Sequence, residues 1–152
     1  MRIKGTVFSG FGRGEQLIEK WKGRISHLMG FTPFCGTLNV RLGSTIDMAP
    51  YSTISMDYVM LHGEKHVDAR FAPVRLAFGG KEEACWAMRD TAKTHKDDVL
   101  EIVSAKNLKQ AMGLKDGDEV EIELPEKAYK KTKVPGFDMV QRMMQKETRA
   151  RV

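Results

Sequence analysis

Apolar and polar residues alternate over most of this 152-residue chain, and the alternation predicts short β-strands. Glycine and aspartate pairs such as Gly79-Gly80 and Asp116-Gly117 interrupt the pattern, as expected for tight turns. The segments predicted as strands are 3–8, 38–42, 58–61, 65–71, 74–78, 84–88, 99–103 and 120–124. Many short strands expose many edges unless the sheet closes on itself, so we predict a mainly β fold in the form of a small closed barrel.

Apolar residues recur at helical spacing in three other stretches. The first runs from Glu15 to Met29, and Gly30 stands at the usual terminator position. The second is the short segment 107–112, and the third lies in the tail from Phe137 onward, which ends in polar and basic residues. We therefore expect a few short helices, a barrel domain over residues 1–126 and a basic, helical C-terminal extension over residues 127–152.

The composition is that of an ordinary globular protein, with 41% hydrophobic and 30% charged residues. No apolar run approaches the roughly 20 residues that a membrane helix needs, and the first ten residues lack the apolar core of a signal peptide. We expect a cytoplasmic protein that does not engage a membrane, with Cys35 and Cys85 as reduced thiols. The formal charge of +5 suits a phosphate-rich ligand or a nucleic acid and does not choose between them.

A glycine-rich turn, SGFGRG at residues 9–14, separates the first predicted strand from the first predicted helix. Glycines let successive backbone amides approach an anion closely, and the start of the following helix adds a positive partial charge. The pattern indicates a phosphate site, but a plain strand-to-helix turn explains the same residues. It is not a Walker loop, because no Gly-Lys-Ser/Thr follows.

Polar residues stand at the start of the strand that follows, in the sequence GTLNVRL at residues 36–42. Thr37 and Asn39 are two positions apart, so their oxygens lie on one side of the strand, opposite Leu38 and Val40. Two neutral oxygens can hold a magnesium ion when substrate phosphates supply the charge. The alternative is that both side chains bond to neighbouring backbone in a barrel loop.

Glu101 lies between Leu100 and Ile102 in a later strand and faces away from the core side of that strand. It reads either as a solvated glutamate or as a group that accepts a hydroxyl proton or a ligand hydrogen bond. Lys106, Asn107 and Lys109 follow it at the start of a short helix. They can cap that helix and cover the surface, or they can contact a base and its phosphates.

The three stretches together resemble the archaeal-type CTP-dependent riboflavin kinases. The resemblance rests on VFSGFGRG, then GFTPFCGTLNVRL, then LEIVSAKNLKQAMGLKDGDEVEIEL, in the same order as in that family, and it spans about residues 5–124. It implies a six-stranded cradle-loop barrel related to the RIFT barrels. It also implies an enzyme that transfers the terminal phosphoryl group of CTP to the ribityl 5′-hydroxyl of riboflavin, giving FMN and CDP.

The resemblance also implies roles for individual residues. Thr37 and Asn39 would coordinate Mg²⁺, Thr94 and Glu101 would contact the flavin, and Glu101 would orient or deprotonate the acceptor hydroxyl. The residues implied in nucleotide binding are Phe11, Gly12, Arg13, Gly14, Glu15, Gln16, Lys106, Asn107, Leu108 and Lys109. The chain departs from the family pattern at Glu15-Gln16, at Cys35 and at Lys109, where an aromatic pair, proline and arginine are common.

Two other classes compete with the kinase. The segment AMGLKDGDEVEIEL also resembles the last turn and strand of AbrB-like DNA-binding proteins, which share barrel ancestry with the riboflavin kinases. Such modules are about a third of this length and need neither SGFGRG nor GTLN, so a nucleic-acid partner is the weaker expectation. A barrel that binds a nucleotide or flavin without catalysis is the other alternative. The expected partners are CTP or CDP and riboflavin or FMN, bound by a monomer.

Overall fold

The computed structural model describes residues 1–10, 18–19, 22–23, 25–27, 29–34, 36–59, 66–90, 98–125 and 132–134. The strands are β1 (Arg2–Phe8), β2 (Leu38–Leu42), β3 (Ile54–Val59), β4 (His66–Phe78), β5 (Lys81–Asp90), β6 (Val99–Val103), β7 (Glu119–Glu123) and β8 (Thr132–Val134). Helix α2 covers Leu108–Met112, and the described residues between Ile18 and Met29 are helical.

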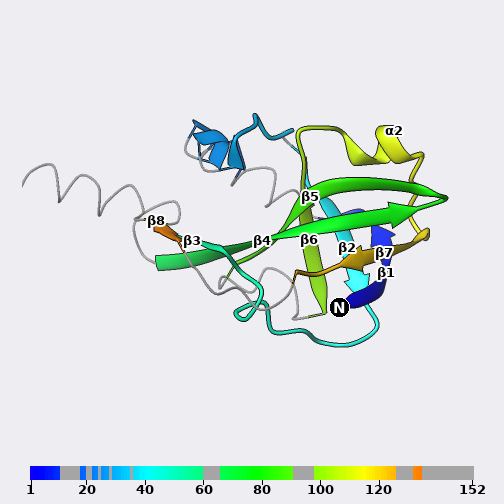
Figure 1. Cartoon of the computed structure of the whole chain (residues 1–152), viewed down its shortest axis with the longest axis horizontal. Helices are drawn as coiled ribbons and strands as arrows, with labels where there is room; N and C mark the ends of the chain where they lie inside the picture. The colour runs from blue at the N-terminus through cyan, green and yellow to red at the C-terminus, as the bar shows by residue number, and fades with distance from the viewer. Residues whose placement is uncertain are drawn as a thin grey trace, which may run out of the picture.

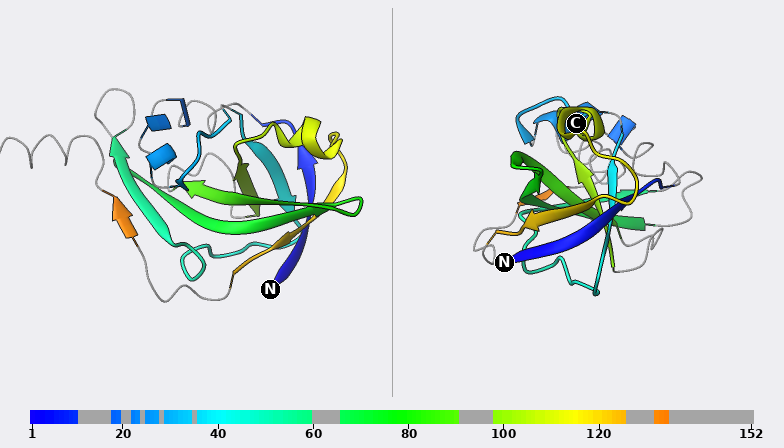
Figure 2. Two further views of the ribbon diagram at one scale, coloured as in Figure 1. Left: turned by 45° about the horizontal axis from the view of Figure 1, so that its top comes forward. Right: turned by 90° about the vertical axis from the view of Figure 1, so that its right-hand side faces the viewer.

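Six of these strands close into a ring. The order β5-β6-β2-β1-β7-β4 is completed by a pairing of β4 with β5, and every pairing in the ring is antiparallel. Strand β3 continues the sheet outward from β4, and β8 runs parallel to β3 (Figures 1 and 2). The predicted mainly β, six-stranded barrel is confirmed, and its cradle-loop subtype stays a prediction.

Strand β4 is longer than the sequence pattern predicts. The two expected strands, 65–71 and 74–78, are one continuous strand that runs through Pro73. Strand β3 pairs with β4 up to Phe71, and β7 pairs with it from Arg75 onward. Pro73 falls in the gap between these two partners, which is a position where a residue without a backbone N–H is tolerated.

The sheet carries apolar side chains on both faces. The larger cluster fills the ring and includes Leu38, Val40, Leu100 and Ile102. A second cluster joins the helical segment, through residues such as Ile18, to the opposite face of the sheet. Side chains that alternate with the ring core, as Asn39 and Glu101 do, therefore emerge on the face that the helical segment partly covers.

Gly5 in β1 allows this strand to pack closely on β2. A Cβ atom at Gly5 would lie 2.4 Å from Cγ1 of Val40 on the paired strand. Real Cβ atoms do not approach a neighbour this closely, so the packing of β1 on β2 depends on the missing side chain. This contact helps to set the position of β2, which carries the predicted metal ligand Asn39 and begins directly after Thr37.

Several further sequence predictions can be compared with the structure only in part, because many of their residues are not described. Within the predicted extension, Thr132–Val134 form strand β8, and the predicted tail helix lies outside the described residues. Cys85 is a free, buried thiol, and burial raises its pKa to about 12, so it is unreactive at neutral pH. Cys35 lies outside the description. Among the helices described, none is long and apolar enough to span a membrane.

Candidate functional site

Asn39 and Glu101 lie directly opposite each other on neighbouring strands. In the β2–β6 ladder Asn39 pairs with Glu101, and in the β1–β2 ladder it pairs with Phe8. Both polar side chains are buried, each 7% exposed. Because Leu38 and Val40 face the ring core, alternation directs Asn39 to the other face, where Glu101 also lies. The fold thus joins a predicted metal ligand to the predicted catalytic residue.

The side chain of Asn39 holds an unsatisfied oxygen. Its Oδ1 atom is buried and has no hydrogen-bond partner within the part of the chain that the structure describes. Leaving a buried acceptor unpaired costs about 1–3 kcal/mol, so such an atom needs an explanation. The alternative in which Asn39 satisfies neighbouring backbone therefore does not hold for this oxygen. A cation or ligand that accepts the lone pairs would remove the cost.

The start of the glycine turn packs on this carboxamide. A Cβ atom at Gly10 would lie 2.3 Å from Nδ2 and 2.7 Å from Cγ of Asn39. Only a glycine lets the backbone approach that closely. Residues Phe11 to Gln16, predicted to cradle the phosphates, lie outside the described residues. Gly10, which directly precedes them, adjoins Asn39.

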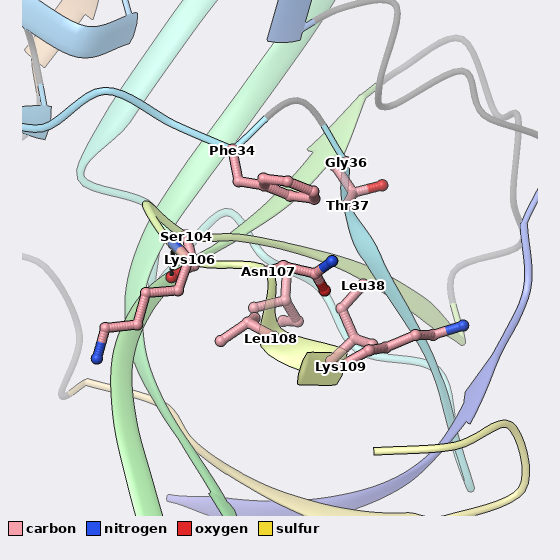
Figure 3. Close-up of a pocket in the computed structure, with 10 residues that line it drawn as sticks. Phe34, Gly36, Thr37, Leu38, Ser104, Lys106, Asn107, Leu108 and Lys109 are labelled. Carbon is pink, nitrogen blue, oxygen red and sulfur yellow. Dashed lines mark hydrogen bonds between the residues drawn. The ribbon is translucent and has the colours of Figure 1, made fainter. Parts of the chain in front are cut away.

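A cavity of about 210 Å³ lies at the start of β2, where Thr37 and Leu38 line it. It brings Thr37 together with all four residues of the predicted nucleotide-binding segment 106–109 (Figure 3). Phe34 and Thr37 lie on one side of the cavity, and Asn107, Leu108 and Lys109 lie on the other. The lining residues are Phe34, Gly36, Thr37, Leu38, Ile102, Ser104, Lys106, Asn107, Leu108 and Lys109.

The two sides of the cavity are tied together by Ser104. Its carbonyl accepts a 2.7 Å hydrogen bond from the backbone N–H of Phe34. Its hydroxyl accepts one of 3.1 Å from the backbone N–H of Lys106. Asn107 then begins α2, and its side-chain oxygen accepts a bond from the N–H of Gln110. The predicted nucleotide-binding segment 106–109 is thus held in place by hydrogen bonds within the protein.

The two lysines of the segment extend in different directions (Figure 3). The ammonium of Lys106 pairs with Glu83 of β5 at 3.0 Å. The ammonium of Lys109 pairs with Asp116 at 3.0 Å. Asp116 also accepts a 2.5 Å hydrogen bond from the hydroxyl of Ser9, directly before Gly10. Lys109 is therefore held beside the start of the glycine turn.

One carboxylate oxygen of Asp116 accepts a hydrogen bond from Ser9 of the glycine turn, and the other accepts one from Lys109 of the segment 106–109. Asp116 therefore connects the two segments that are predicted to bind phosphates. The hydrogen bonds from Ser9 and then from Lys109 lower the pKa of this carboxyl below its ordinary value of 3.8. A lowered folded-state pKa stabilises the fold above the unfolded-state value, and the stabilisation is lost as the pH falls through the folded-state value.

We expect Asp116→Ala to lower the urea midpoint slightly at pH 7, because the contacts are exposed and screened by solvent. The difference from wild type should shrink as the pH is lowered below about 3.8, where the carboxyl begins to take up its proton. Ser9→Ala should lower the midpoint in the wild-type protein and add nothing to Asp116→Ala. Fully additive losses would mean that the two residues are not coupled.

Glu101 is placed beside apolar neighbours. It pairs with Met88 across the β5–β6 ladder and with Asn39 on its other side. Its burial rules out the alternative of a solvated strand glutamate. Thr94, the other predicted flavin contact, lies outside the described residues. Within the described ranges, no group of three or more His, Cys, Asp or Glu side chains could hold a metal ion.

Two residues that line the cavity are absent from the sequence predictions, and a third residue of the site lies in a predicted motif. Ser104 and Phe34 line the cavity, and Gly10 packs on Asn39. Gly10 belongs to SGFGRG, so its motif gave a signal, whereas its contact with Asn39 follows only from the tertiary structure. Nothing in the local pattern distinguishes Ser104 from an ordinary loop serine.

Comparison with known proteins agrees with the sequence resemblance. The family model CTP-dep_RFKase, described as "Domain of unknown function DUF120", matches residues 7–124. A riboflavin kinase of Methanococcus vannielii is 32% identical over 125 residues, with 80% of this chain and 96% of that protein covered. A riboflavin kinase of Saccharolobus solfataricus is 33% identical over 129 residues, covering 82% of this chain and 74% of that protein.

Some relatives are longer. The riboflavin kinase of Methanospirillum hungatei is 32% identical over 129 residues, and these cover 82% of this chain but 58% of that protein. The aligned part still includes most of the present chain. Since the family model spans more than half of the sequence and these relatives align along most of it, the chain belongs to the CTP-dependent riboflavin kinase family and is a kinase.

Proposed function

We propose that this protein is a riboflavin kinase that uses CTP as the phosphoryl donor and releases FMN and CDP. One observation carries the proposal. The buried, unpartnered Oδ1 of Asn39 lies two residues from Thr37, and Thr37 lines the cavity of the segment 106–109. An oxygen that lacks a partner, two residues from a threonine that lines a cavity with a lysine, suits a nucleotide whose phosphates bring the negative charge. The donor assignment rests on the family.

Thr37 and Asn39 would hold a divalent metal ion, for which Mg²⁺ is our proposal. Hydroxyl and carboxamide oxygens are ligands that Mg²⁺ accepts, and an oxygen without a partner is available at Asn39. When bound, the ion would neutralise charge that develops on the transferred phosphoryl group. Both side chains are neutral, so the site should bind the metal mainly together with the nucleotide.

In the proposed reaction, a bond forms between the ribityl 5′-oxygen of riboflavin and the terminal phosphorus of CTP. The bond from that phosphorus to the bridging oxygen of CDP breaks, and the hydroxyl proton leaves to a base or to water. Glu101 is opposite Asn39, so a hydroxyl held beside the terminal phosphate would be within its reach. We assign Glu101 the role of orienting this hydroxyl and accepting its proton late in the transfer.

The direct test is incubation of the protein with riboflavin, MgCl₂ and either CTP or ATP, with FMN measured by chromatography. We expect FMN with CTP and much less with ATP. Absence of FMN with every nucleotide would overturn the kinase proposal, and FMN with ATP alone would overturn the donor assignment. A DNA titration at physiological salt tests the alternative of a DNA-binding protein, and we expect only weak, non-specific association.

A further inference from the structure

Phe34 is an exposed aromatic residue on a firmly held backbone. In the described part of the chain, Met1 and Phe34 are the large hydrophobic side chains that are exposed, and Phe34 is 42% exposed. Met1 directly precedes β1, whereas Phe34 follows the buried Pro33 and lines the cavity. Its N–H donates to the carbonyl of Ser104 at 2.7 Å, so the exposed ring does not belong to a loose end.

The ring lies against a glycine and borders the cavity. A Cβ atom at Gly36 would be 3.0 Å from Cε1 of Phe34, so the lack of a side chain there leaves room for the ring. Figure 3 shows the ring at the rim of the cavity, across from Asn107. An apolar ring kept in solvent beside a cavity is a frequent mark of a ligand contact, because burying it against a ligand recovers hydrophobic free energy.

The cavity has two distinct ends. Thr37 and the ammonium of Lys109 lie toward one end (Figure 3), and Lys109 pairs there with Asp116, which also bonds to Ser9 directly before Gly10. A hydroxyl and a cation at this end suit phosphates. Phe34 and Ser104 belong to the other part of the lining, where Lys106 turns away to Glu83. A nucleotide whose phosphates lie at Thr37, Asn39 and Lys109 would thus direct its base toward Phe34.

We propose that Phe34 is the stacking surface for the nucleobase of the donor nucleotide. The inference rests on the proposed function, because it takes the phosphate end from that assignment. Stacking on a phenyl ring uses the π-face that every base has, so it raises affinity without selecting a base. Phe34 therefore contributes to binding of the donor, and recognition of cytosine must come from other groups of the cavity.

The test is calorimetric titration of nucleotide into the protein with MgCl₂ and without riboflavin, so that binding is measured apart from turnover. Phe34→Ala should raise the Kd of CTP at least about fivefold and that of ATP by a similar factor, as expected for one lost stacking contact. Phe34→Trp should bind as well as wild type. Inorganic tripolyphosphate, which has no base, should bind wild type and Phe34→Ala equally. Circular dichroism melting should show unchanged folding, since the ring is exposed.

Three results would overturn the assignment. An equal loss for tripolyphosphate would mean that the substitution disturbs the phosphate end. A raised KM for riboflavin with an unchanged Kd for CTP would assign the ring to the flavin. An unchanged Kd for CTP and ATP, in a protein that still makes FMN, would reject the stacking contact alone. Failure of the wild-type protein to bind any nucleotide would reject the proposed function and this inference together.

Discussion

Replacing Asn39 by leucine is expected to abolish FMN formation and, at the same time, to make the protein more stable. The carboxamide oxygen is buried without a partner in the described chain, so the folded protein carries its desolvation cost. Leucine has the same branched shape, with four side-chain heavy atoms, and no polar atom. The free energy of unfolding of the variant should therefore rise by about 1 kcal/mol, whereas loss of the proposed metal ligand should lower kcat at least about 100-fold.

The measurement pairs urea unfolding with the FMN assay on the same preparations. Asn39→Asp serves as the matched control, because it keeps an oxygen at the same position and should retain more activity than the leucine variant. It adds a negative charge opposite Glu101, so it should be less stable than wild type. An Asn39→Leu protein that unfolds more easily and keeps most of its activity would show that the carboxamide is structural.

Much of the barrel can be predicted from local pattern because alternation is a local property. Strand β2 alternates apolar and polar residues, and β6 directs Leu100 and Ile102 toward the ring core; the bounds of both strands agree with the prediction. The continuity of β4 through Pro73 could not be predicted, since proline ordinarily ends a strand. It is tolerated because β4 changes partner from β3 to β7 at that point, and partner choice depends on residues far away in the sequence.

The same distinction holds in the site. Thr37 and Asn39 are noticeable in the sequence because they interrupt an apolar pattern, and a period of two predicts a common side for them. Since β2 begins at Leu38, directly after Thr37, that common side stays a prediction. The position of Asn39 opposite Glu101 follows from the pairing of β2 with β6, and no local signal encodes that register. The fit of Gly10 on Asn39 is even harder to predict from the sequence, because it depends on where a turn contacts a side chain of another strand.

Gly10→Ala is expected to lower kcat about 100-fold without changing the fold of the barrel. The added methyl group would lie 2.3 Å from Nδ2 of Asn39, so either the carboxamide or the turn must move by several tenths of an ångström or more. Misplacement of a positioning group by about 1 Å can cost about 100-fold in rate. Gly43→Ala is the matched control, because a Cβ there meets nothing within 4 Å, and it should be fully active.

A stability cycle tests whether the methyl group acts through Asn39. In the wild-type background, Gly10→Ala should lower the free energy of unfolding, by about 1–3 kcal/mol for an overpacked contact. In an Asn39→Ala background the carboxamide is gone, so the same substitution should cost much less. The difference between the two losses is the coupling between the residues. Equal losses in the two backgrounds would mean that the methyl group disturbs the turn itself and leaves Asn39 in place.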